Sequence, residues 1–212
     1  MKNFVSIGLS VLLCLGAMGA GFALGKYLDG ETTIFEKVEK PNDNNISDTT
    51  GEPKVFTEWQ LCTDVTQLAV GDKIVIAALN YHFAMSTTQN TSNREATSIT
   101  HNGQTIICDE NVQVITLKEG VFENTFALNV NGGYLYAASS SSNQLKTRND
   151  LQENASWLVS IEDYGEANIV AQGSTTKNLL KYNVKSNLFA CYDSGSTQDP
   201  IAIYKQADST KN

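Results

Sequence analysis

The chain has 212 residues and a formal net charge of −8 at pH 7, with 15 Lys and Arg against 23 Asp and Glu. Binding to nucleic acid or to anionic lipid requires a basic face that neutralises phosphates, so we expect no nucleic-acid partner. The length suits one domain of ordinary size together with additional segments.

The first additional segment is apolar and lies at the amino terminus. Residues Phe4 to Gly25 carry no charged side chain and are long enough for a helix that crosses a hydrocarbon layer, which takes about 20 residues. Small residues before Lys26 suit a signal peptidase, but the stretch exceeds the usual core of a cleaved signal. Residues 1–25 are therefore either a signal peptide or a retained membrane anchor. In both cases the remainder of the chain is expected outside the cytoplasm, and an uncleaved helix would leave the amino terminus inside.

The composition changes after this segment. Residues 26–54 are rich in Asp, Glu, Asn, Lys and Thr, with Pro41, Gly51 and Pro53 as breakers. Such a sequence cannot support a core, so we expect an acidic, flexible and disordered linker. A folded domain is predicted for residues 55–206, and a disordered tail for residues 207–212.

The folded region is predicted to be all-β. Segments such as Lys73–Ala78 and Tyr134–Ala138 are rich in β-branched and aromatic residues, as strands are. Glycine turns such as Gly132-Gly133 bracket them, and no stretch keeps a helical period for three turns.

The strands are expected to form three units of four strands each. Units of about 45 to 50 residues with this content cannot bury their apolar faces separately, so they must share one core. The expected strands are Trp59–Thr63, Lys73–Ala78, His82–Ser86 and Thr97–Thr100 in the first unit, Val112–Leu117, Thr125–Val130, Tyr134–Ala138 and Gln144–Thr147 in the second, and Trp157–Ile161, Ala167–Ala171, Asn178–Tyr182 and Leu188–Tyr192 in the third. Ile201–Tyr204 would return to the first strand and cover its edge. The strand Ile106–Cys108 fits no unit and is assigned to an inserted hairpin.

Three such units predict a β-trefoil-like barrel capped by three hairpins. The second unit resembles the trefoil family in placing a Tyr-Leu-Tyr strand after a glycine turn, at Gly133 to Tyr136. Sugar-binding trefoils carry a Gln-x-Trp signature in each unit, and this sequence lacks it. Trp59 and Trp157 are instead assigned to core packing.

A second resemblance covers nearly all of residues 59–205. The chain is similar to an uncharacterised all-β accessory domain appended to secreted or surface proteins of bacteria. The motifs that carry this similarity are Trp59-Gln60-Leu61, Val70-Gly71-Asp72-Lys73-Ile74-Val75-Ile76, Met85-Ser86-Thr87-Thr88-Gln89-Asn90, Gly133-Tyr134-Leu135-Tyr136-Ala137-Ala138-Ser139-Ser140 and Leu188-Phe189-Ala190-Cys191-Tyr192. The resemblance implies an accessory module in the cell envelope.

Local spacing supplies no catalytic group. His82 and His101 lack a second histidine, a cysteine pair or a Glu-x-x-His neighbour, so we expect no metal and no cofactor. The chain has no nucleophile elbow and no phosphate-binding glycine loop. Cys62, Cys108 and Cys191 are too few to staple a domain of this size, and although one pair could bond, we expect no disulfide. We therefore do not expect an enzyme.

Ligand binding has a better basis in three loops between third and fourth strands, where Ser and Asn recur beside aromatic residues. Flat aromatic faces and neutral hydrogen-bonding groups suit sugars. The candidate ligand-binding residues are Gln89, Asn90, Asn93, Tyr134, Tyr136, Asn143, Tyr182, Asn187 and Tyr192. The alternative is that Ser and Asn only supply turn chemistry, with Asn tolerating a left-handed backbone.

These observations predict an extracytoplasmic, non-catalytic binding or adhesion module whose partner is a glycan or a cell-envelope component. Two alternatives stay open: a secreted hydrolase with a site assembled across the repeats from carboxylates, and a structural surface spacer.

Overall fold

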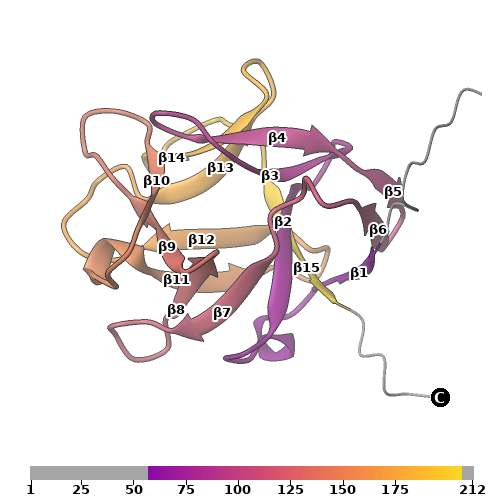
Figure 1. Cartoon of the computed structure of the whole chain (residues 1–212), viewed down its shortest axis with the longest axis horizontal. Helices are drawn as coiled ribbons and strands as arrows, with labels where there is room; N and C mark the ends of the chain where they lie inside the picture. Colours follow the sequence, from indigo (N-terminus) through magenta and orange to yellow (C-terminus); the bar gives the residue numbers. More distant parts are fainter. Residues whose placement is uncertain (1–56, 207–212) are drawn as a thin grey trace, which may run out of the picture. The chain divides into compact units, whose positions relative to one another are not determined.

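The computed structural model of the chain describes residues 57–206, and the predicted amino-terminal helix, the linker and the tail lie outside this range. Within it the protein is all-β, as the sequence predicts (Figure 1). Apart from strands, this part holds only the short 3₁₀ helices η1 (Val65–Gln67) and η2 (Glu153–Ala155), and neither approaches the length of a membrane-spanning helix.

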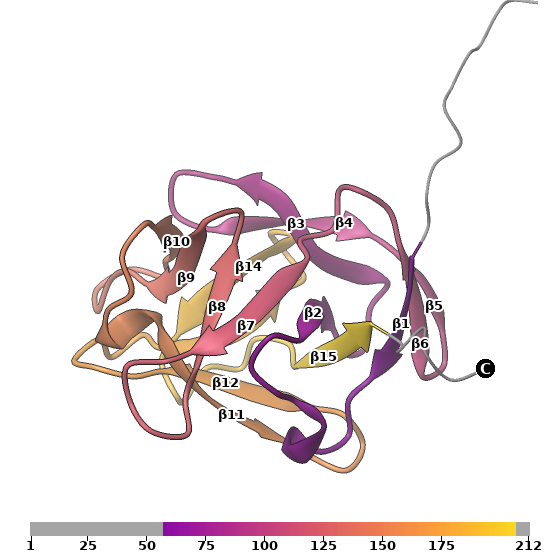
Figure 2. The ribbon, with the colours of Figure 1, turned by 60° about the horizontal axis from the view of Figure 1, so that its bottom comes forward.

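Six strands pair with one another in a cycle. Each is antiparallel to the next, and the last pairs again with the first. In order they are β2 (Lys73–Ala78), β7 (Ile115–Glu119), β8 (Phe126–Val130), β11 (Ser156–Ile161), β12 (Ala167–Ala171) and β15 (Ile201–Gln206). Figure 2 shows β7 beside β8 and β11 beside β12.

Three hairpins connect successive strands of this cycle, so that an order of strand, hairpin and strand occurs three times along the chain. The hairpins are β3 (Phe83–Gln89) with β4 (Arg94–Ser98), β9 (Gly133–Ala137) with β10 (Leu145–Arg148), and β13 (Leu179–Asn183) with β14 (Leu188–Tyr192). They overlap the third and fourth strands predicted for each unit, although β4 begins three residues before the predicted Thr97–Thr100. The hairpins also contact one another, because β14 pairs with β4 and the Leu145 N–H donates to the Ser92 carbonyl over 2.9 Å.

The first predicted strand lies in a different place from the one that the sequence indicated. β1 (Thr57–Leu61) pairs with β15 and with β6 (Thr105–Cys108), and with no other described strand. β7 and β11 open the second and third units and pair with β8 and β12. The equivalent partner of β2 is β15, which shares five residue pairs with it. The expectation that Trp59 opens the first unit is therefore wrong. Residues 73–206 already supply all six strands of the cycle, and β1 packs outside them.

The expected inserted hairpin is confirmed. β5 (Thr100–Asn102) pairs with β6, and Gly103 between them has φ +61. This left-handed conformation favours glycine, because a Cβ would be strained there. The hairpin extends the outer layer that β1 begins.

The apolar residues form two clusters, one on each face of β2 and β15. Ile74 and Ile76 belong to the larger cluster, while Val75 and Ala77 pack with Trp59 in the smaller one. These strands read as continuous apolar runs because both of their faces are covered. β9 and β12 instead alternate buried and half-buried residues, as strands with one buried face do. The expectation that both tryptophans pack in the core is confirmed.

Arg94 is a buried cation where two hairpins meet. One of its terminal nitrogens donates to Thr147 Oγ1 on β10 over 2.7 Å, and the other donates to the Gln113 side chain and to the Thr87 carbonyl. No carboxylate within residues 57–206 forms an ion pair with it. Burial lowers the pKa of Arg94 from its usual value. Neutral hydrogen bonds therefore hold this charge in place of a counter-ion.

The free thiols of the described region predict a loss of stability in alkaline solution. Burial raises the pKa of Cys62 to about 11 and that of Cys108 to about 12, from an ordinary value of 9.0. Above pH 9 the unfolded chain releases these protons while the folded chain keeps them, so stability falls as the pH rises. We expect the midpoint of thermal unfolding to decrease between pH 9 and about pH 11. A Cys62→Ala/Cys108→Ala variant should show a shallower decrease, and an equal slope in both proteins would contradict this explanation.

Candidate functional site

Two of the predicted ligand-binding residues are packing residues in this structure. Tyr182 is 1% exposed, with its ring centroid 5.1 Å from that of Phe189, and its hydroxyl donates to Asn187 Oδ1 over 2.8 Å. Tyr192 is also buried, and its hydroxyl accepts from Asn183 Nδ2 over 3.1 Å. Neither tyrosine offers a face that a ligand could reach without disrupting the core.

The predicted amide residues are used mainly by turns. Gln89 Nε2 donates to the carbonyls of Asn90, Asn93 and Leu145, and Asn90 Nδ2 donates to Asn93 Oδ1 over 3.0 Å. These three side chains therefore close the tip of β3–β4 and tie it to β10. Turn chemistry, the alternative interpretation of these residues, accounts for these contacts.

The remaining predicted residues belong to the other two hairpins. Asn143 Oδ1 accepts from Lys177 Nζ over 2.8 Å. Asn187 has φ +49, the left-handed conformation expected of a turn asparagine. Tyr134 and Tyr136 are half-buried and lie two residues apart on β9, so they share one face of the strand. The nine candidates are thus distributed over three hairpins.

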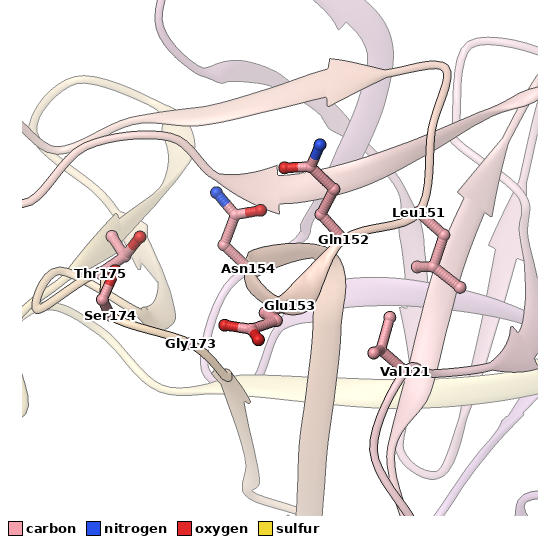
Figure 3. Close-up of a pocket in the computed structure, with 8 residues that line it drawn as sticks. All are labelled: Val121, Leu151, Gln152, Glu153, Asn154, Gly173, Ser174 and Thr175. Carbon is pink, nitrogen blue, oxygen red and sulfur yellow. The ribbon is translucent and has the colours of Figure 1, made fainter.

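A pocket of about 380 Å³ lies elsewhere, between three connections (Figure 3). The β7–β8 loop contributes one wall, the segment from β10 to η2 a second, and the β12–β13 loop a third. Its lining residues are Val121, Leu151, Gln152, Glu153, Asn154, Gly173, Ser174 and Thr175. The volume falls in the range of about 300 to 1,000 Å³ that small-molecule sites occupy.

One backbone carbonyl holds two of these walls in place. The Ala137 oxygen accepts from Asn154 Nδ2 over 3.0 Å and from Thr175 Oγ1 over 3.4 Å. The third wall is attached separately, because the Val121 N–H donates to Ser156 Oγ over 2.8 Å. The walls are therefore positioned before any ligand arrives, which reduces the entropy that binding would lose.

Arg148 and Asp150 orient the amides at the pocket edge. Arg148 Nε donates to Asp150 Oδ1 over 3.0 Å, and a second guanidinium nitrogen donates to Asn154 Oδ1 over 3.3 Å. Gln152 Nε2 donates to Asp150 Oδ2 over 2.6 Å. The hydrogen bond from Arg148 lowers the pKa of the Asp150 carboxyl, so that group stays ionised and paired at neutral pH. The guanidinium also lies 5.0 Å from the centroid of the Tyr136 ring.

Two polar side chains in the pocket have no partner within residues 57–206. The Glu153 carboxylate forms neither a hydrogen bond nor an ion pair there, and the Ser174 hydroxyl forms no hydrogen bond. Gly173 has φ +83, and an added Cβ would lie 3.0 Å from Glu153 Cβ. The glycine thus allows the two walls to approach closely.

Sequence reasoning did not find this pocket. The available signals were the hydroxyl-rich turn Gly173-Ser174-Thr175-Thr176 and the amides on either side of Glu153. Each segment has an ordinary loop composition, and the sequence does not indicate that the two lie close together in the fold.

No metal centre is formed in the described range. Across residues 57–206, no three His, Cys, Asp or Glu side chains gather closely enough to hold an ion. His82 and His101 do approach each other, with ring centroids 5.6 Å apart, and His101 Nε2 lies 3.0 Å from the Tyr204 hydroxyl.

Comparison with known proteins supports an all-β fold for this chain and shows no family. No family model matches the sequence, and no curated protein matches it. A solved structure of a GH43 β-1,3-galactosidase is similar with a TM-score of 0.52 and 10% identity, over 73% of this chain and 30% of that one. The lysenin pore is similar with a TM-score of 0.46 and 14% identity, over 79% of this chain and 56% of that one. The chain therefore spans about a third of the length of the galactosidase, and the likeness shows a shared fold only.

Proposed function

We propose that residues 73–206 form a β-trefoil-like barrel and that the protein is an extracytoplasmic, non-catalytic module that binds carbohydrate in the 380 Å³ pocket. Support for the barrel comes from the cyclic pairing of six strands and from the threefold order of strand, hairpin and strand. The extracytoplasmic location is supported by the apolar segment Phe4 to Gly25 and by the resemblance to envelope accessory domains.

The observation that carries the binding proposal is the composition of the pocket. Sugar hydroxyls both donate and accept hydrogen bonds, and sugar rings have apolar faces. The lining offers Glu153 and Ser174 as unpaired polar groups, with Val121 and Leu151 as apolar surface. Phe122 follows the lining residue Val121 in the sequence, and its aromatic ring is exposed. The lining is mainly polar, because five of its eight residues carry amide, carboxylate or hydroxyl groups. Such a lining suits a ligand rich in hydroxyl groups, each of which can both donate and accept a hydrogen bond.

The number of carboxylates favours binding over hydrolysis. Glycoside hydrolases commonly use a pair of Asp or Glu side chains on either side of the scissile bond. Glu153 is the single carboxylate among the residues that line the pocket. A binding role requires no second one.

A glycan array probed with the full chain tests the proposal. Because many detergents carry sugar head groups, the chain should be kept in one that does not. We expect a defined subset of glycans to bind, and Ser174→Tyr to weaken this binding at least about tenfold by filling the pocket. Ser174 is exposed, so the larger side chain should leave the core intact, which thermal unfolding can verify.

Tyr134→Ala is the matched control, because Tyr134 belongs to the face that the sequence indicated and not to the pocket. It should bind as the parent does. If only Tyr134→Ala weakens binding, the site lies on β9 and the pocket is not used. An array without any bound glycan would contradict the function itself.

A further inference from the structure

We infer that the pocket selects glycans that carry a free, protonated amino group and discriminates against glycans that carry carboxylate or sulfate groups. This inference rests on the proposed function and specifies its ligand class. It follows from the distribution of charge around Glu153.

Glu153 is the only charged residue in the pocket lining, and none of the other seven residues is basic. Its carboxylate has no cationic partner within residues 57–206. A ligand that enters the pocket therefore meets one uncompensated negative charge.

Two basic side chains close in sequence to the pocket residues, Arg148 and Lys177, are already engaged. Arg148 pairs with Asp150 through two hydrogen bonds of 3.0 and 3.1 Å, so the pair contributes no net charge. Lys177, two residues beyond Thr175, donates to Asn143 Oδ1 over 2.8 Å and lies 3.8 Å from Asp193 Oδ2. Neither cation is available to neutralise Glu153 or to receive an anionic sugar.

A protonated amine is the sugar substituent that this arrangement suits best. It provides three donors and a positive charge, whereas a carboxylate provides only acceptors. Hydrogen bonds to charged groups are stronger than those between neutral groups. The Ser174 hydroxyl, which also lacks a partner in the described residues, can accept from the same amine or bond an adjacent sugar hydroxyl. An N-acetyl group removes the positive charge and so loses the attraction.

Oligosaccharides with one backbone and different substituents test this directly. Cellotetraose, the chitosan tetramer, chitotetraose and a β-1,4-glucuronate tetramer differ mainly in carrying hydroxyl, ammonium, acetamide or carboxylate groups. Titration calorimetry with the full chain, at mildly acidic pH and in a detergent without sugar, gives the four affinities. We expect the chitosan tetramer to bind about three to ten times more tightly than cellotetraose, and the glucuronate tetramer to bind least. The preference should decrease as salt is added.

Glu153→Gln is the critical variant, because it keeps the shape of the side chain and removes its charge. It should bind the chitosan tetramer and cellotetraose about equally. Glu110→Gln changes the net charge identically at an exposed position outside the pocket, and it should keep the full preference. This control separates pocket recognition from general attraction between an acidic protein and a cationic sugar.

The outcomes separate the two proposals. If the chitosan tetramer binds no more tightly than cellotetraose, or if Glu110→Gln lowers the preference as much as Glu153→Gln does, the inference is overturned while the carbohydrate-binding function stands. If none of the tetramers binds, the inference is overturned, and an array without ligands overturns the function as well.

Discussion

Replacing Trp157 with alanine is expected to lower the free energy of unfolding by about 3 to 5 kcal/mol. The side chain is fully buried in the larger apolar cluster, and its Nε1–H donates to the Leu135 carbonyl over 3.1 Å. Alanine would leave a large cavity in this cluster and would remove the hydrogen bond to the Leu135 carbonyl. Denaturant unfolding of the full chain, followed by fluorescence and by circular dichroism, measures the loss.

Leu158 provides the matched control on the same strand. It follows Trp157 directly, but its side chain points to the opposite face and is 49% exposed. Leu158→Ala should change the free energy of unfolding by no more than about 1 kcal/mol. Similar losses for the two variants would show that the interior does not lie on the Trp157 side of β11.

Replacing Tyr182 with alanine is expected to destabilise the protein by a similar amount, about 3 to 5 kcal/mol. The ring contacts Tyr81, Phe83 and Phe189, with centroids 5.6, 6.2 and 5.1 Å away. Aromatic rings at such separations contribute beyond the area they bury. The loss would appear as a lower unfolding midpoint in denaturant.

Tyr182→Phe distinguishes a packing role from a ligand role. It keeps the aromatic cluster and removes the hydrogen bond to Asn187 Oδ1, so a loss of only about 1 kcal/mol is expected. Binding of any glycan found on the array should be unchanged in this variant. A ligand role would predict the opposite result: lower affinity in Tyr182→Phe with stability preserved.

The burial of Tyr182 could not be predicted from the residues that are close to it in the sequence. The repeat predicted a strand at Asn178–Tyr182, and the structure has β13 at Leu179–Asn183. A local pattern of this kind does not say which other strands cover the faces of that strand. Tyr81 and Phe83 come from about 100 residues earlier in the chain, and their contact with Tyr182 buries a ring that, in sequence, looks available beside a turn.

The placement of β1 has a similar explanation. Trp59-Gln60-Leu61 has the same local character as the segments that begin the second and third units, so strand content was predicted correctly. The predicted return of Ile201–Tyr204 to this strand was also correct, since Leu61 lies opposite Tyr204. The place of β1 in the first unit, next to β2, was not predicted correctly. β15 occupies that position with five residue pairs. Trp59 is then buried on the outer face, against Val75, Ala77 and Tyr204.

Strand positions, hairpin turns and the near absence of helix could be read from residues close in the chain, because backbone preferences and alternation act over a few residues. The pocket could not be predicted in this way. Its walls come from loops near residues 121, 152 and 174, and the pairing of β7, β8, β11 and β12 brings these loops together. A lone Glu in a loop is ordinarily a solvated charge. Here Glu153 becomes a candidate recognition group because folding leaves Arg148 and Lys177 paired with other side chains.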